Sequence, residues 1–220
     1  MIKATLSYWR KTELEKCKEF PPYLFYLSVK ENFESILKNG ILSKKESKKM
    51  RLSYKSFADP DVQELRSVKG IFISNGQKCN IHDLVPLYFK AKTPTSYKIK
   101  DIQKELFFCK ISIKKLISNT NKHFAFTDGN ATNLDTKQYW DLRKLGKLEW
   151  KIINAASWHD KPDGKRIRNA EFFIQSKIEK EYIFEFSVNN NDLKNELENI
   201  LKKKQIKIPV TIDEKCFFTT

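Results

Sequence analysis

One carboxylate stands out because it occurs where an apolar strand is expected to begin. Glu171 follows Arg166 and Arg168 and directly precedes the apolar run Phe172-Phe173-Ile174. A half-buried strand normally carries an apolar or neutral residue there, since burying a carboxylate without a partner is costly. Glu171 is therefore either half of a structural ion pair or a catalytic group, and composition alone favours the ion pair.

The sequence offers few other catalytic arrangements. His82-Asp83 precedes an apolar segment, so both side chains are expected at a strand end, where a ligand could be reached. With His123 and His159 as the only other histidines, and with four widely spaced cysteines, no metal site is expected. The glycine-rich motifs of Rossmann and P-loop proteins are missing, so any nucleotide must be held by side chains and helix starts.

The composition describes a basic protein with a real core. The chain has 220 residues, a formal net charge of +15, 40% apolar residues and 13% aromatic residues. These values fit a single domain, and the charge favours a polyanionic partner, although lysine-rich surfaces also arise from general composition. No apolar stretch of about 18 residues and no signal-peptide block occur, so we expect a soluble, cytoplasmic protein without membrane contact.

Hydrophobic patterns predict an α+β fold with a mixed or antiparallel sheet and flanking helices. Strands are expected at residues 23–27, 70–73, 85–91, 106–113, 182–188 and 208–212, and helices at residues 28–39, 137–148 and 192–204. Ser28 and Glu31 form a capping-box pattern for the first helix, and Gly40 is expected to end it. Pro86 favours an edge or a strand start. The basic segment 43–69 predicts a long excursion or short helices.

Several segments together resemble the DarT-type DNA ADP-ribosyltransferase toxins, which use NAD to modify a base in single-stranded DNA. The stretches long enough to be specific lie within residues 81–89 and 126–131, and residues 168–172 also match. Shorter matches are Tyr26 with residues 32–42, residues 63–66, Thr93-Pro94, residues 148–150 and Trp158. All of them keep the family's order between residues 23 and about 190.

The resemblance implies one ADP-ribosyltransferase domain over residues 1–220, with a fold related to the poly-ADP-ribose polymerases. Residues 1–20 are then an N-terminal extension, which is either a helix that packs or an arm on DNA. Residues 49–69 correspond to the element that covers NAD, and residues 126–171 to the turn-turn loop that meets the DNA base. Tyr26 and Val29 stand where the family commonly has histidines, so the NAD contacts are expected to differ there.

The resemblance also implies that Glu171 and Arg66 are the catalytic residues, with Arg51 as a weaker rival for the arginine. Breaking the nicotinamide bond builds positive charge on the ribose, so a fixed carboxylate stabilises the transition state more than the substrate. Glu171 could also take a proton from the attacking base. Arginine is a poor base, so Arg66 is assigned to the NAD phosphates and to base orientation, although the family's mechanism has been framed with it in proton transfer.

NAD is the implied co-substrate, and DNA is the implied acceptor. The residues expected to contact NAD are Tyr26, Leu27, Ser28, Ser35, Leu42, Arg66, His82, Tyr88 and Phe89. Those expected to contact single-stranded DNA are Arg143, Lys144, Lys147, Trp158, Arg166 and Arg168, since basic and aromatic side chains together suit a single strand. Trp158 could equally belong to the core, and Arg166 and Arg168 could equally be structural.

The sequence thus predicts an NAD-dependent mono-ADP-ribosyltransferase that modifies thymine or guanine in single-stranded DNA. The family's context implies the toxin of a toxin–antitoxin pair, with a macrodomain-type antitoxin as its partner. Two other functions stay open from the residues themselves. One is a nonenzymatic domain that binds single-stranded nucleic acid, in which Glu171 only pairs with Arg166 or Arg168. The other is an NAD hydrolase, or an NAD-using transferase that modifies RNA or protein.

Overall fold

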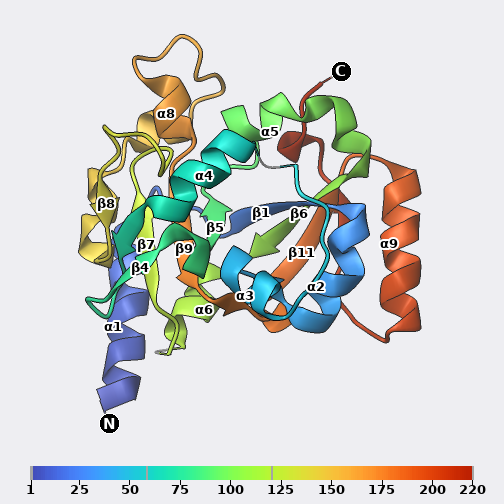
Figure 1. Cartoon of the computed structure of the whole chain (residues 1–220), viewed down its shortest axis with the longest axis horizontal. Helices are drawn as coiled ribbons and strands as arrows, with labels where there is room; N and C mark the ends of the chain where they lie inside the picture. The colour runs from blue at the N-terminus through green and yellow to red at the C-terminus, as the bar shows by residue number, and fades with distance from the viewer. Residues whose placement is uncertain (1, 58, 120, 220) are drawn as a thin grey trace.

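An eight-stranded sheet built from the apolar segments organises the fold (Figure 1). The computed structural model describes residues 2–57, 59–119 and 121–219. In spatial order the strands are β12 (Val210–Ile212), β11 (Ile183–Val188), β6 (Leu106–Ile111), β1 (Leu24–Val29), β5 (Leu84–Tyr88), β9 (Glu171–Gln175), β7 (Phe124–Thr127) and β8 (Gln138–Tyr139). Only β11 and β12 run parallel, which confirms the expected mixed sheet.

Two small sheets and a set of short helices surround the large sheet (Figure 1). The small sheets pair β2 (Ile41–Leu42) with β10 (Lys177–Ile178) and β3 (Gly70–Phe72) with β4 (Lys78–Asn80). The α-helices are α1 (Ile2–Lys16), α2 (Phe33–Asn39), α3 (Lys44–Lys49), α4 (Pro60–Val68), α5 (Pro94–Lys98), α6 (Ile113–Ser118), α7 (Trp150–Ile153), α8 (Gly164–Arg168) and α9 (Asn191–Lys203). The 3₁₀ turns are η1 (Lys30–Asn32), η2 (Ile81–Asp83), η3 (Lys100–Glu105), η4 (Leu142–Lys147), η5 (Lys180–Tyr182) and η6 (Glu214–Cys216).

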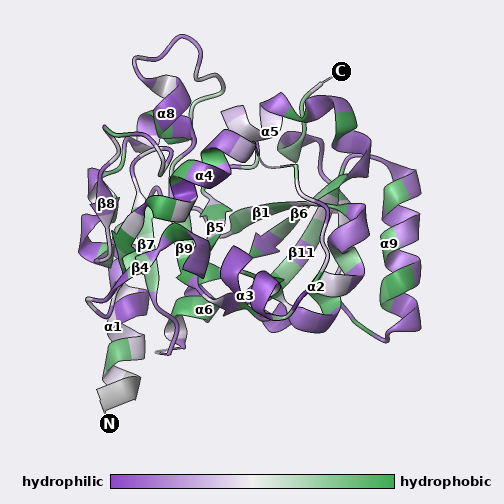
Figure 2. Ribbon diagram, viewed as in Figure 1, coloured by the Kyte–Doolittle hydropathy of each residue, from purple (hydrophilic) through white to green (hydrophobic). Residues whose placement is uncertain are grey.

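Hydrophobic residues gather on the central strands, whereas the outer faces of the helices are hydrophilic (Figure 2). α9 shows how the pattern works, because Leu193, Leu197 and Leu201 recur every four residues and are all buried. Asn190 caps this helix by accepting a hydrogen bond from the Leu193 N–H at 2.8 Å. Such an apolar stripe must be buried against another element, and α9 packs beside β12.

Two local predictions are wrong. Ser28 does not cap a helix, because it pairs with Phe107 inside β1 and the helical turn starts only at η1. The predicted helix 137–148 is instead β8 followed by η4. Its buried residues Leu142, Leu145 and Leu148 recur every three residues, which a 3₁₀ turn satisfies better than an α-helix.

Gly40 ends α2 as predicted, and its conformation requires glycine. Its φ is +80°, and a Cβ at this position would lie 2.5 Å from the Ile178 carbonyl oxygen. Pro86 does not lie at an edge, since β5 is an interior strand between β1 and β9. On the β1 side, however, β5 pairs only at Phe25–Tyr88, so no ladder bond to β1 is lost at Pro86.

The separation of β1 from β5 opens the sheet at its centre. Toward β9, in contrast, β5 pairs along its whole length, and Tyr88 lies directly opposite Glu171. Side chains alternate between the two faces of a strand, so Phe172 and Ile174 enter the main core while Glu171 and Phe173 face the other side. The first residue of β9 thus lies level with the point at which β1 and β5 still pair, at the edge of the opening.

The N-terminal segment forms a packed helix, which is one of its two predicted roles. Leu14 of α1 belongs to the main core. The buried Arg10 donates from Nη1 to the carbonyl oxygens of Ile117, Asn119 and Lys122 at 3.3, 3.2 and 3.0 Å. Within the described residues, no helix has the length and apolar character needed to cross a membrane.

Candidate active site

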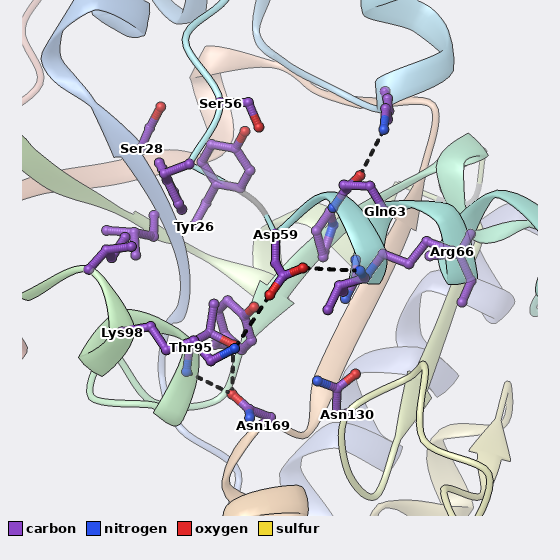
Figure 3. Close-up of a pocket in the computed structure, with 18 of the residues that line it drawn as sticks. Tyr26, Ser28, Ser56, Asp59, Gln63, Arg66, Thr95, Lys98, Asn130 and Asn169 are labelled. Atoms are coloured by element: carbon purple, nitrogen blue, oxygen red, sulfur yellow. Dashed lines mark hydrogen bonds and ion pairs between the residues drawn. The ribbon is translucent and has the colours of Figure 1, made fainter.

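A cavity of about 280 Å³ lies between β1, β5 and α4 (Figure 3). β1 contributes Tyr26, Leu27 and Ser28 to one wall, and α4 faces them with Gln63 and Arg66. The turn after β7 closes the cavity with Asn130, and α8 and the residue after it contribute Lys165 and Asn169. The residue before α4, Asp59, closes it together with Thr95 and Lys98 of α5. The cavity therefore joins the two segments that the sequence analysis singled out, 49–69 and 126–171.

Glu171 and Arg66 form a buried ion pair at the wall of this cavity. Nη2 of Arg66 donates to both carboxylate oxygens of Glu171, at 2.5 and 2.6 Å. Glu171 is 1% exposed and Arg66 is 8% exposed. Arg66 lines the cavity and Glu171 lies behind it. Nε of Arg66 is buried and finds no hydrogen-bond partner among the described residues, so the guanidinium retains one donor that a ligand can use.

The segment after β7 holds Glu171 in place. The Glu171 N–H donates to Oγ1 of Thr127 at 3.2 Å, and this hydroxyl donates to the Gly129 carbonyl oxygen at 2.7 Å. The backbone N–H of Ala131 donates to the Glu171 carboxylate. Gly129 lies directly against the Arg166 side chain, so any Cβ would collide there. The motif at residues 126–131 therefore positions the carboxylate.

Burial dominates the protonation behaviour of the site. It raises the pKa of Glu171, although the Arg66 guanidinium opposes that shift. For Arg66, burial disfavours the charged form, but the Glu171 carboxylate outweighs it and raises the pKa. Burial and the nearby Glu171 also raise the pKa of Tyr88 to about 12. Burial, together with Lys44 and Arg66, lowers the pKa of His82, which favours the neutral imidazole at pH 7.

Most residues predicted to contact NAD do line the cavity. These are Tyr26, Leu27, Ser28, Leu42, Arg66, His82 and Tyr88. Ser35 lines a smaller cavity of about 50 Å³, which shares Tyr26, Ser28 and Leu42 with the larger one. These placements are compatible with a ligand that extends from one cavity into the other.

Phe89 does not line the cavity, and its predicted NAD contact has no support in the structure. It is fully buried on the other face of the sheet, where its ring lies edge-on to Phe20, Trp150 and Phe172. The reason is the two-residue period of a strand, because Tyr88 faces the cavity and its neighbour must face the core. Alternation along residues 85–89 could have indicated this.

Arg168 and Arg166 are held by contacts within the protein, in line with the structural role that the sequence had left open for both beside a contact with DNA. Arg168 is buried and donates to the carbonyl oxygens of Lys92, Ile153 and Ala155, each at 2.7 Å. Burial lowers its pKa to about 10. Arg166 donates to the carboxylates of Asp128 and Asp163 at 2.8 and 2.5 Å. Both guanidinium groups thus stabilise the 126–171 segment from within.

Three further residues predicted to contact DNA lie away from the cavity. Arg143, Lys144 and Lys147 are exposed on η4, which contacts α1. The Trp150 indole N–H donates to the Leu145 carbonyl oxygen at 2.9 Å, and the Trp150 ring packs against Phe89. η4 therefore lies on the sheet face that carries Phe89, opposite to the face that carries Tyr88 and Glu171.

Trp158 is also buried, and it packs between the Arg168 guanidinium at 5.5 Å and the His159 ring at 4.9 Å. Its ring lines a second cavity beside the first. Among the two roles that the sequence left open, the structure thus favours a core position with one accessible edge.

The sequence analysis missed several polar residues of the cavity wall. Asn169 accepts hydrogen bonds from the N–H and the hydroxyl of Thr95, at 3.3 and 3.0 Å (Figure 3). Lys98 lies 3.5 Å from Asp59. Asn130 lies in the matching stretch 126–131 and Asn169 in the matching stretch 168–172. The position of Asn130 in a turn and that of Asn169 close to Glu171 were the available signals. Asp59, Thr95 and Lys98 carried no signal in the sequence.

The lining is strongly positive, which suits an anionic ligand. Its basic residues are Lys44, Lys55, Arg66, Lys98 and Lys165, and its acidic residue is Asp59. Phosphates bind well to such a set of cations. Among the described residues, no group of three histidine, cysteine or carboxylate side chains is placed to hold a metal ion.

Comparisons with known proteins find one matching family model and several similar proteins. A family model described as "ssDNA thymidine ADP-ribosyltransferase, DarT" matches residues 25–218. The DNA ADP-ribosyl transferase of Thermus sp. strain 2.9 is 26% identical over 190 residues, which cover 83% of this chain and 88% of that protein. A Thermosipho africanus fusion of DNA ADP-ribosyl transferase and DNA ADP-ribosyl glycohydrolase is 23% identical over 205 residues, covering 90% of this chain and 50% of the fusion.

Solved structures share the fold. Thermus sp. 2.9 DarT in complex with ADP-ribosylated ssDNA is similar with a TM-score of 0.80 at 23% identity, covering 90% of this chain and 97% of that one. The same protein in complex with NAD⁺ is similar with a TM-score of 0.75 at 21% identity, covering 90% of this chain and 98% of that one.

Proposed function

Because the chain belongs to the DarT family of single-stranded-DNA thymidine ADP-ribosyltransferases, we propose that it transfers ADP-ribose from NAD to a thymidine base. Family membership confirms the resemblance drawn from the sequence, including NAD-dependent ADP-ribosylation of DNA. The choice of thymidine over guanine, and the roles of individual residues, are proposals for this chain. The choice of thymidine follows the description of the matching family model. The observation that carries the residue roles is the buried Arg66–Glu171 pair at the wall of a cationic cavity.

Glu171 is the proposed catalytic carboxylate. As the bond between nicotinamide and ribose breaks, positive charge develops on the ribose, and a fixed carboxylate stabilises that charge more than it stabilises the neutral sugar. In thymidine the ring nitrogen that still carries a proton is N3. N3 forms the new bond to C1 of the ribose, nicotinamide leaves with the electron pair of the broken bond, and the N3 proton passes to Glu171 or to water.

Arg66 is the proposed partner of the NAD diphosphate. Its guanidinium lines the cavity, and its Nε donor is unused among the described residues. When a diphosphate binds beside it, the guanidinium gains a second anionic partner, so an oxygen of Glu171 becomes available to the ribose. Lys44 and Lys98 add positive charge to the same wall. Tyr26 and Ser28 lie on the wall opposite α4, where they can hold the nicotinamide or a ribose (Figure 3).

The proposed biological role is that of a toxin with an opposing enzyme. Modified thymidine cannot pair normally, so unchecked transfer would harm the cell that makes it. The Thermosipho africanus relative carries a DNA ADP-ribosyl glycohydrolase in the same chain. For the present chain we expect a partner enzyme of that activity, either separate or fused. The sequence resemblance implies that this partner is a macrodomain-type antitoxin.

Mass spectrometry of short oligonucleotides tests the activity. Wild-type protein with NAD should add the mass of one ADP-ribose to oligonucleotides that contain thymidine. Glu171→Gln should lower the rate by about 100- to 1,000-fold, the usual effect of removing a fixed group that stabilises transition-state charge. It should still bind the DNA. Glu64→Gln, an exposed neighbour on α4, is the matched control and should keep the wild-type rate.

The same experiment separates the alternatives. If the wild type forms no adduct on any DNA sequence, the transferase activity is rejected and the nonenzymatic nucleic-acid-binding domain is the remaining alternative. Loss of NAD without an adduct would indicate a hydrolase, and an adduct on guanosine would correct the choice of base. Thermal unfolding of Glu171→Gln must accompany the assay, because that variant leaves the Arg66 guanidinium without its carboxylate.

A further inference from the structure

A second cavity of about 510 Å³ adjoins the active-site cavity. It is lined by α5, by residues 158–163 and by the start of α8. Pro94, Lys98 and Lys165 line both cavities. Because the two cavities share these three residues, they are adjacent, and a strand bound in the first is long enough to reach the second.

Aromatic rings line the second cavity. Tyr97 is 41% exposed, and its ring lies edge-on to Trp158 and His159 at 6.3 and 6.2 Å. Trp158 is buried, and the exposed His159 ring stacks on it at 4.9 Å with an interplanar angle of 26°. Trp158 thus supports the cavity. The Lys100 ammonium lies 4.6 Å from the Tyr97 ring centroid, so a flat ring can stack on Tyr97 and on His159 only where Lys100 and Trp158 do not cover them.

Charge in the second cavity is also suited to a nucleotide. Lys98, Lys161 and Lys165 contribute three positive charges to its lining. The acidic residue of the lining is Asp163, and its carboxylate accepts a hydrogen bond from Nε of Arg166 at 2.5 Å. The exposed pair of Lys161 with Asp160 is weak, so a phosphate can compete for the ammonium group.

We propose that the second cavity binds a nucleotide of the single-stranded DNA that flanks the modified thymidine. The inference rests on the proposed function and adds a site to it. A base that reacts outside a duplex must be splayed into a pocket, and the rest of the strand then needs its own contacts. Stacking on Tyr97 or His159 and a phosphate beside Lys161 supply the two kinds of contact that single strands use. Because the two cavities share Pro94, Lys98 and Lys165, one strand can contact both.

Binding of fluorescent oligonucleotides without NAD tests the site directly. The probes contain one thymidine and either no neighbours or two nucleotides on each side. Tyr97→Ala should weaken binding of the longer probe on the order of tenfold, because a base loses its stacking partner, and should leave the shorter probe unaffected. Tyr97→Phe should bind like the wild type. Tyr8→Ala on α1, where the tyrosine is 73% exposed, is the matched control.

Steady-state kinetics give a second readout. Tyr97→Ala should raise the KM for the longer DNA on the order of tenfold and leave kcat and the KM for NAD unchanged. Lys161→Ala should lower the slope of log K against log salt concentration by about one, the value expected for one lost phosphate contact. Lys202→Ala, an exposed lysine on α9, should leave that dependence unchanged.

The outcomes distinguish this site from the proposed activity. If the wild type modifies DNA but Tyr97→Ala and His159→Ala both bind the longer probe normally, the second site is overturned while the activity stands. A raised KM for NAD alone would assign the cavity to the dinucleotide and also overturn it. If no adduct forms but Tyr97→Ala still weakens DNA binding, the site stands without the activity. His159→Ala keeps the test valid if Tyr97→Ala fails to fold.

Discussion

Glu171 and Arg66 depend on each other because both are buried. A charged group taken out of water loses its hydration, and the attraction of a close partner offsets that loss. Nη2 of Arg66 lies within 2.6 Å of both carboxylate oxygens. The pair therefore belongs to the fold and to the proposed chemistry together, since the same burial that requires a partner would also strengthen the field of the carboxylate on a ribose.

Removing the arginine should make stability depend on pH. Arg66→Met leaves Glu171 buried without a counter-charge, so its folded-state pKa rises further above the unfolded value. Between those two values the folded protein binds more protons than the unfolded one, and stability falls as pH rises. We expect Arg66→Met to lower the free energy of unfolding by about 3–5 kcal/mol at pH 8 and by less at pH 5.

Urea unfolding at the two pH values measures this effect. The double variant Arg66→Met with Glu171→Gln carries no charge at the site and should show no such difference between pH 5 and pH 8. An equal loss of stability at both pH values in Arg66→Met would contradict the idea that an uncompensated carboxylate causes it.

At the scale of elements, a buried arginine side chain, Arg10, links α1 to the rest of the fold in addition to the packing of Leu14. Arg10 binds three carbonyl oxygens around the end of α6, and its guanidinium lies 5.5 Å from the Phe124 ring of β7. Carbonyl groups at a helix end have no partner within the helix, so Arg10 supplies one from another element. α1 thereby supports β7, whose following turn holds Glu171.

Arg10→Ala should therefore destabilise the protein without disturbing the cavity. We expect a loss of about 2–3 kcal/mol, the size of hydrogen bonds to a charged group, measured by urea unfolding. The KM for NAD should not change, because no residue of α1 lines either cavity. Lys11→Ala on the same helix is the control. A decrease in the free energy of unfolding below about 0.5 kcal/mol, the usual range for surface substitutions, would show that Arg10 does not hold α1 in place.

At the scale of the whole molecule, the two faces of the sheet have different tasks. One face carries Tyr88, Glu171 and the two cavities, which share Lys98 and Lys165. The other carries the main core and is covered in part by α1 and η4. The net charge of +15 is spread over both faces and attracts DNA in general, but only cations near the cavities can contact a strand bound there.

Salt dependence of DNA binding distinguishes the two faces. Lys165→Ala should lower the slope of log K against log salt concentration by about one, as expected for a lost phosphate contact. Lys147→Ala on η4 should leave the slope unchanged, although the sequence alone placed Lys147 among the DNA contacts. The reverse result would mean that the strand crosses the face covered by α1.

The sequence by itself determined the elements whose signals are local. Apolar runs located β1, β5, β6 and β11 because burial of alternate side chains requires such runs. Short motifs around residues 126–131 and 168–172 identified the family and, with it, Glu171 and Arg66. These signals need no knowledge of which strands are neighbours.

Only the tertiary structure decided which residues meet. The sequence offered Arg166 or Arg168 as structural partners of Glu171, yet the partner is Arg66, which lies 105 positions away. That contact depends on the order of β5 and β9 in the sheet and on α4 lying over them. The alternation of side chains along β5 likewise placed Phe89 in the core. The carbonyl oxygens of Lys92, Ile153 and Ala155 enclose Arg168, and Tyr97 of α5 stays exposed beside Trp158. Contacts between distant segments follow from the arrangement of the elements, and local sequence patterns do not specify that arrangement.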